Sequence, residues 1–197
     1  EEDLVVGLAV LCHDFGKPLT TAFRDGRIRS PGHESAGIDP AREFMQRLNV
    51  PHRILEQVLP LVKCHMRPAT LYRDRSSVGA VRRLARDCGR MDLLLRVFQA
   101  DAGGRPDLPD DSAEATAWLQ EEARRLDVSR SRPEPVLKGR HLLQRGWEAG
   151  PGMGRILDRA YEAQLDGEFA GVEEALQWLE DQGIPESPVT QPGKPKS

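Results

Sequence analysis

The sequence is poor in several features that mark particular classes of protein. Its three cysteines, Cys12, Cys64 and Cys88, are too few and too unevenly spaced for a disulfide framework or a zinc ribbon. This usage favours a reducing compartment, and we expect a cytoplasmic protein. No apolar run approaches the ~18 residues of a membrane-spanning helix, so we expect no membrane partner. A net charge of −3 gives no global basic signal for nucleic acid and leaves only local patches for such contacts.

The chain also lacks an initiating methionine and opens on Glu1-Glu2-Asp3. We therefore expect it to be part of a longer protein. Its 39% hydrophobic and 30% charged residues are typical of a globular protein, and 197 residues correspond to one domain or slightly more.

Helical periodicity dominates the sequence, whereas the alternation typical of strands is nearly absent. We therefore predict an all-α fold, a helical bundle followed by a small helical subdomain. Ser30-Pro31 has the residues of a helix start, and Asp25-Gly26 and Gly150–Gly154 are predicted turns. The predicted helices cover residues 4–11, 30–48, 51–65, 77–88, 91–102 and 112–126, then 139–146, 155–165 and 172–182.

A change of composition near Ser129 divides the chain. The segment SRSRPEP is polar and contains proline, which is typical of a linker. We predict a first domain over residues 1–128 and a helical subdomain over 136–182, a candidate for RNA binding. The proline-rich tail, residues 183–197, is predicted to be disordered.

The stretch LCHDFGKP, residues 11–18, carries the clearest chemical signal. It places His13 and Asp14 directly after an apolar helix, which Gly16 and Pro18 are expected to end. Two adjacent polar groups in this setting are costly to bury unless they bind something. We therefore expect this pair to be functional.

Three more residues of suitable chemistry fall at the ends of later predicted helices. His33 opens one in PGHESAG, His65 ends one in VKCHMRP, and Asp101 closes the run LLLRVFQAD. A packed bundle can gather such ends into one pocket, where imidazoles and carboxylates suit Mn, Fe, Co, Ni or Zn better than Mg. The alternative for each histidine is a helix cap or a solvated side chain, which is how we interpret His52 and His141. The predicted metal ligands are His13, Asp14, His33, His65 and Asp101.

A site of this kind supports hydrolysis of phosphoesters. A bound divalent metal lowers the pKa of water from 15.7 toward about 7 and neutralises phosphate oxygens. Asp14 would be a ligand and orient the water, and Lys17, about one turn further on, would offer a compact cation to the phosphate. Arg67 and Arg105, close in sequence to the last two ligands, are further candidates for phosphate contact.

These motifs resemble a known family. HDFGK, followed by GHE, a later histidine and a later aspartate, resembles the HD superfamily of metal-dependent phosphohydrolases, whose ligands follow the order H…HD…H…H…D. LAVLCHDFGKP, with GHESAG and RLNVP, is similar to the HD region of bacterial CCA-adding enzymes, the tRNA nucleotidyltransferases. GRHLLQRGWEAGPGMGRILDRAYEAQLDG is similar to a C-terminal stretch of the wider tRNA nucleotidyltransferase and poly(A) polymerase group.

The resemblance implies activity on 2′,3′-cyclic nucleotides and small phosphate esters with a metal such as nickel. It makes His13 and Asp14 the signature ligands and Lys17 a phosphate contact. Two departures matter. The family's first histidine lies upstream of the HD pair, and residues 1–12 contain none, so the site would lack one ligand. A nucleotidyltransferase head, with its glycine-serine turn and paired carboxylates, is also missing, so this chain alone is not expected to add nucleotides.

Two other hypotheses stay open. Arg82, Arg83 and Arg86 lie on one predicted helix and are candidate RNA contacts, and a second basic zone surrounds His141. On this hypothesis the helical body is a non-catalytic tRNA-binding arm whose affinity falls with salt, although the same arginines also fit a solvated face. The third hypothesis is a free-standing HD phosphohydrolase acting on nucleotides, against which the C-terminal subdomain argues.

Overall fold

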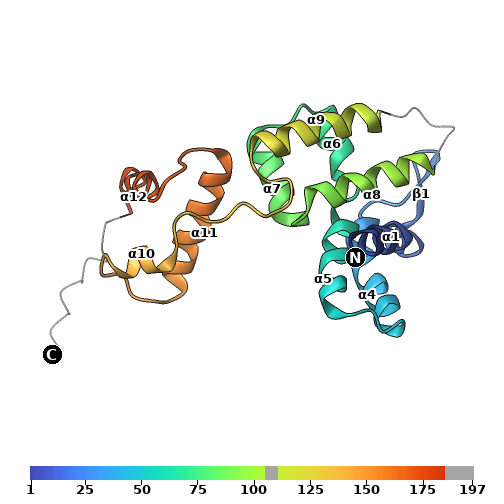
Figure 1. The fold of residues 1–197 in the computed structure, drawn as a ribbon, viewed down its shortest axis with the longest axis horizontal. Coiled ribbons are helices and arrows are strands. Elements are labelled where there is room, and N and C mark those ends of the chain that lie inside the picture. Colours follow the sequence, from blue (N-terminus) through green and yellow to red (C-terminus); the bar gives the residue numbers. More distant parts are fainter. Residues whose placement is uncertain (105–110, 185–197) are drawn as a thin grey trace. The chain divides into compact units, whose positions relative to one another are not determined.

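The computed structural model describes residues 1–104 and 111–184, and helices dominate both ranges (Figure 1). Within these ranges the one sheet is a two-stranded hairpin, so the predicted all-α fold class is confirmed. The chain divides into two compact units, Glu1–Pro133 and a second that begins at Glu134. No helix in the described ranges has the length and apolar character needed to cross a bilayer.

The first unit is a helical bundle with a small hairpin near its start. Its elements are α1 (Glu2–Cys12), α2 (Lys17–Thr20), β1 (Ala22–Arg24), β2 (Arg27–Arg29), α3 (His33–Ala36), α4 (Ile38–Arg47), α5 (His52–Cys64), α6 (Arg67–Arg73), α7 (Val78–Cys88), α8 (Met91–Gly103) and α9 (Ser112–Arg125).

The core of this unit is built where α1 packs against α5 and α8. Val5 and Ala9, four residues apart and so on one helix face, are completely buried, as are Leu61 of α5 and Leu94 of α8. Burying one such Leu or Val side chain contributes roughly 1.5–3 kcal/mol. This packing fixes three helices whose C-terminal ends carry residues of the predicted metal site.

The prediction of a single helix from Ser30 to Leu48 is wrong. The chain becomes helical only at His33 and is divided at Gly37 into α3 and α4. Glycine is a poor helix former, and here the backbone of Gly16 lies against this point. A Cβ built on Gly16 would be 2.0 Å from the His33 carbonyl oxygen and 2.6 Å from the Gly37 nitrogen. The division of the helix thus accommodates a close approach of two backbone segments.

Other local expectations also need correction. The expected turn at Gly150–Gly154 is wrong, because helix α11 begins at Pro151, and proline is favoured in a first helical turn. Pro18 likewise lies in the first turn of α2 and does not simply end the preceding helix. Residues 22–29, for which the sequence predicts no strand, form the short β1–β2 hairpin. Its turn lies at Asp25-Gly26, as expected, with φ of 51° and 74°.

The second unit comprises α10 (Gly139–Leu143), α11 (Pro151–Asp166) and α12 (Val172–Asp181). Leu142 of α10, Ala160 of α11 and Ala175 of α12 are almost completely buried in its core. Of the tail predicted to be disordered, only residues 183 and 184 are described. The Ile184 N–H donates to the Leu179 carbonyl at 2.9 Å, and the remainder lies outside the described residues.

Candidate metal centre

The five predicted ligands come from the ends of four helices. His13 and His65 immediately follow α1 and α5, His33 is the first residue of α3, and Asp101 lies in the last turn of α8. Asp14 follows His13 directly. The C-terminal end of a helix carries partial negative charge, and α1, α5 and α8 all present this end to the site. These three C-terminal ends favour a cation here before any side chain is considered, whereas the four-residue α3 begins at the site.

The structure brings all five side chains together. The Nε2 atom of His13 lies 3.2 Å from Asp14 Oδ2 and 3.2 Å from Asp101 Oδ1. Asp14 Oδ1 is 3.2 Å from His33 Nε2, which in turn is 3.3 Å from His65 Nε2. Potential ligand atoms of His13, Asp14 and His65 all lie within 4.8 Å of one another. The side chains that the sequence places at helix ends therefore lie together in one compact cluster.

The three histidines are oriented in the same way. Each Nδ1 lies within hydrogen-bond distance of the backbone carbonyl three residues earlier, at 2.6 Å for His13, 2.8 Å for His33 and 2.7 Å for His65. A carbonyl oxygen can only accept, so Nδ1 carries the proton in each neutral ring. This arrangement fixes the tautomer and leaves the Nε2 lone pair free, as for histidines that bind metals. All three Nε2 atoms belong to the contacts at the centre of the cluster.

These atoms fit a divalent cation. Ligand atoms about 2.1 Å from one ion lie roughly 3.0–3.4 Å apart when they are neighbours in tetrahedral or octahedral coordination, and the contacts above measure 3.2–3.3 Å. Without a cation, lone pairs of neutral Nε2 atoms would face one another and two carboxylates. The donor set of three imidazoles and two carboxylates suits a transition metal or zinc.

The electrostatics differ between the buried and the more open side of the cluster. The Asp101 carboxylate beside Nε2 favours the protonated ring and raises the pKa of His13, while burial acts in the opposite direction. Burial lowers the pKa of His65, which is only 1% exposed. His65 is thus kept neutral with its lone pair available, whereas His13 lies in the negative field of the carboxylates.

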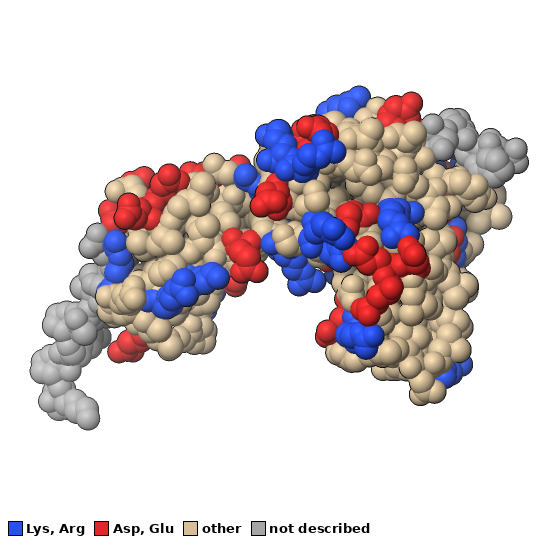
Figure 2. All heavy atoms as spheres, in the orientation of Figure 1, with Lys and Arg blue, Asp and Glu red and all other residues tan. Residues whose placement is uncertain are grey.

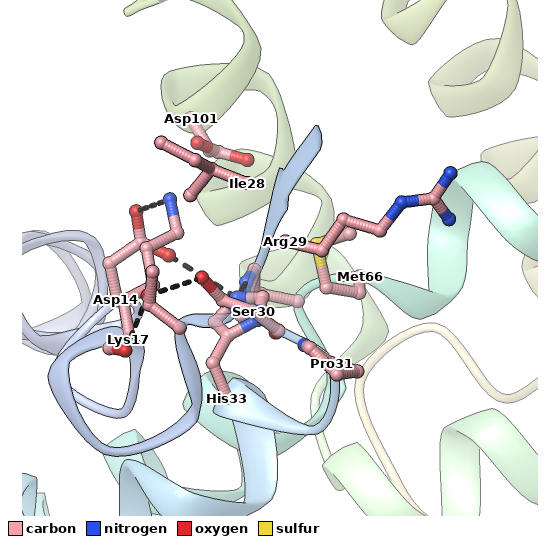
Figure 3. A pocket seen from close by; sticks show the side chains of 11 residues that line it. Asp14, Lys17, Ile28, Arg29, Ser30, Pro31, His33, Met66 and Asp101 are labelled. Atoms are coloured by element: carbon pink, nitrogen blue, oxygen red, sulfur yellow. Dashed lines mark hydrogen bonds and ion pairs between the residues drawn. The ribbon is translucent and has the colours of Figure 1, made fainter. Parts of the chain in front are cut away.

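A pocket of about 670 Å³ opens onto the cluster, a volume within the range of small-molecule sites. Asp14, Lys17, His33, His65 and Asp101 line it together with residues of the hairpin and Met66. Figure 3 shows Asp14 and Lys17 side by side, with the Lys17 Nζ 2.5 Å from Asp14 Oδ2. The predicted phosphate-binding lysine is therefore at the pocket, paired with a predicted ligand.

Sequence reasoning missed the hairpin side of this pocket. Thr21, Ile28, Arg29, Ser30 and Pro31 all line it. The Asp-Gly pair within residues 22–29 is a known hairpin signal and could have indicated these strands, but their three-residue length gave little alternation to detect.

The predicted arginines lie elsewhere. Arg67 is not among the pocket-lining residues, and its guanidinium pairs with Asp87 at 2.6 Å. Arg86 also binds Asp87, at 2.9 Å, and neither Arg82 nor Arg83 is without a partner. Arg105 lies outside the described residues. Figure 2 shows basic and acidic side chains interspersed on the visible face of the first unit.

The two histidines that we interpreted as structural have different surroundings. His52 lies at the start of α5, with its side chain 79% exposed and 3.6 Å from Glu56. His141 belongs to the second unit, where its Nδ1 accepts a hydrogen bond from the Lys138 N–H at 3.1 Å. Of the four histidines described in the first unit, three therefore belong to the cluster and His52 does not.

The sequence of this chain is similar to those of several known proteins. The chain is 35% identical over 185 residues to the CC-adding tRNA nucleotidyltransferase of Thermus thermophilus, covering 91% of this chain and 40% of that protein. It is 29% identical over 187 residues to the A-adding tRNA nucleotidyltransferase of Deinococcus radiodurans, covering 91% and 42%. The multifunctional CCA protein of Laribacter hongkongensis is 36% identical over 136 residues, covering 65% and 31%.

The chain is related to one region of tRNA nucleotidyltransferases. It spans less than half the length of these relatives. No family model and no solved structure matches it. The cluster of candidate ligands lies within the first unit, and the two longest of these alignments cover most of both units.

Proposed function

We propose that the first unit is an HD-type, metal-dependent phosphohydrolase within a tRNA nucleotidyltransferase-like protein. The observation that carries this proposal is the convergence of three Nε2 atoms, each on a ring whose Nδ1 is held by the carbonyl three residues earlier. Such an arrangement has little use in a purely structural core, because it buries polar lone pairs without donors to satisfy them.

The residues that would hold the metal are His13, Asp14, His33, His65 and Asp101. A divalent ion bound there would lower the pKa of water and would neutralise charge on the phosphate oxygens. The 2′,3′-cyclic ester of a nucleotide and simple phosphate monoesters are the proposed substrates.

The protein side chains then have separable roles. Asp14 is contacted by His13, His33 and Lys17, so its carboxylate is fixed at the boundary between the ligand cluster and the pocket. It orients the attacking water. Lys17, with a side chain 49% exposed, places a cation where a phosphate enters. In the reaction the water oxygen bonds to phosphorus, the ester P–O bond breaks, and the proton of water ends on the leaving alcohol.

Hydrolysis of 2′,3′-cyclic AMP with Ni²⁺ or Mn²⁺, together with metal analysis of the purified chain, tests this proposal. His13→Ala and Asp14→Ala should each lose bound metal and turnover, while the exposed His52→Ala serves as a matched histidine control and should retain both. Turnover that persists in His13→Ala and Asp14→Ala would exclude this cluster as the active site.

A second candidate function is tRNA binding. It is favoured by the alignment with two enzymes whose names specify tRNA, over 91% of this chain. Arg82, Arg83 and Arg86 of α7 would contribute through phosphate contacts, so affinity should fall as salt rises. Charge reversal at these three positions should weaken binding of a tRNA and flatten its salt dependence. Unchanged affinity would leave the arginines as a structural face.

A further inference from the structure

The hairpin beside the pocket exposes an unusual amount of apolar surface. Phe23 of β1 and Ile28 of β2 are each 75% exposed. They are direct cross-strand partners in the antiparallel register. Directly opposed residues project from the same face with Cβ atoms about 4.5–5.5 Å apart. The two side chains therefore form one small apolar patch, which we call the hairpin patch.

The hairpin patch is continuous with the pocket. Ile28 and Asp101 both line the pocket, and Figure 3 labels both. Met66, 42% exposed, is a further apolar residue of the pocket lining. The pocket thus combines a polar floor, made by the cluster and Lys17, with a hairpin side that carries Thr21, Arg29 and Ser30 as well as Ile28. Phe23 extends the apolar part of this side outward.

The hairpin is also anchored to the metal cluster. At its base the hydroxyls of Thr21 and Ser30 are 2.7 Å apart and hydrogen bonded. The Ser30 carbonyl accepts the hydrogen bond from His33 Nδ1 at 2.8 Å. The residue that ends the hairpin therefore orients one ligand, and the patch has a fixed place relative to the reacting phosphate.

We propose that Phe23 and Ile28 bind the base of a nucleoside phosphoester while its phosphate lies at the cluster. This inference rests on the proposed phosphohydrolase function and adds its specificity-determining residues. A nucleoside phosphate matches both parts of the pocket, with an anion at one end and a flat aromatic ring that can stack on Phe23 at the other. A small ester such as glycerol phosphate would use only the floor.

Two secondary phosphate monoesters, adenosine 3′-monophosphate and glycerol 2-phosphate, provide the test, because they differ in whether a base is present. Stacking of a base on an aromatic side chain is worth about 1–3 kcal/mol, so Phe23→Ala should lower kcat/KM for the nucleotide by about fivefold or more and leave glycerol 2-phosphate unchanged. Phe23→Trp should restore the nucleotide rate, and Ile28→Ala should give a smaller loss of the same selectivity. Leu48→Ala, which truncates another exposed apolar side chain away from the pocket lining, should leave kcat/KM for both substrates unchanged.

Saturation-transfer NMR of the adenine protons gives a readout that does not require turnover. Transfer to adenine that is present in the native chain and lost in Phe23→Ala supports the patch even if no ester is hydrolysed, which would count against the proposed function alone. Two outcomes, each with unchanged saturation transfer to adenine, would overturn the base-binding role: an equal effect of Phe23→Ala on kcat/KM for both esters, or no effect on either. Both outcomes would leave the proposed hydrolysis unaffected.

Discussion

The two units treat histidine in opposite ways. In the first unit, Nδ1 of His13, His33 and His65 donates to a carbonyl three residues earlier, and Nε2 faces other polar groups. In the second unit, Nδ1 of His141 accepts from the Lys138 N–H at the start of α10. In the second unit the histidine therefore caps a helix. In the first unit the three histidines of the cluster direct the lone pair of Nε2 toward other polar groups.

Their cores differ in the same sense. Among the described residues of the second unit, every buried side chain is apolar, whereas the first unit buries His33 and His65 next to its hydrophobic core. A buried imidazole whose second nitrogen has no fixed donor lowers stability. The first unit therefore carries a cost at His33 and His65 that a bound cation would offset. This difference supports the proposal that the functional site lies in the first unit.

The largest expected effect comes from the close contact behind the cluster. Gly16→Ala places a methyl group 2.0 Å from the His33 carbonyl oxygen. Because this oxygen belongs to the backbone, the clash can be relieved only by moving the backbone of His33 or of residue 16. We expect a loss of about 3 kcal/mol or more in the free energy of unfolding of the first unit, at the upper end of overpacking effects, measured by urea denaturation. Gly7→Ala, in a helix with nothing within 4 Å, should instead stabilise by about 0.5–1 kcal/mol. Similar small effects of both substitutions would argue against the close approach.

A smaller effect is expected in the second unit. His141→Ala removes the acceptor for the Lys138 N–H, and loss of a helix cap of this kind costs about 0.5–1 kcal/mol. Hydrogen exchange should therefore rise in α10 while the amides of α1 and α5 keep their protection. Increased exchange in the first unit would show that His141 has a role beyond its own helix.

The smallest expected effect depends on pH. Burial alone would raise the pKa of the Asp87 carboxyl, but hydrogen bonds from Arg86 and Arg67 outweigh it and hold the pKa below 3.8. A lowered folded-state pKa means that the ionised form stabilises the fold above about pH 3.8, and that this contribution disappears as pH falls through the folded value.

The acid sensitivity of unfolding should therefore be slightly lower in Asp87→Asn than in the native chain, as measured by urea denaturation between about pH 5 and pH 3. The second unit should respond to acid equally in both. An unaltered pH profile of the first unit would contradict the Asp87 pairing.

Much of the cluster could be predicted from the sequence, because its side chains lie at helix ends that periodicity reveals. His13 and His65 each follow an apolar run closely enough to be placed from the sequence. The division at Gly37 could not be predicted, since it depends on the approach of Gly16 from another segment. The Nδ1 partners are backbone carbonyls, which carry no residue signature. The hairpin patch was missed because three-residue strands leave almost no pattern.

We propose that five side chains of the first unit, those of His13, Asp14, His33, His65 and Asp101, together bind a divalent cation. Calorimetric titration of the chain with Ni²⁺ tests it most directly, with Asp101→Asn, a substitution of nearly equal shape, and His141→Ala as the control from the other unit. We expect Ni²⁺ to bind the native chain and His141→Ala, with an affinity at least about tenfold lower in Asp101→Asn. Equal affinity in all three, or no binding in the native chain, would contradict it.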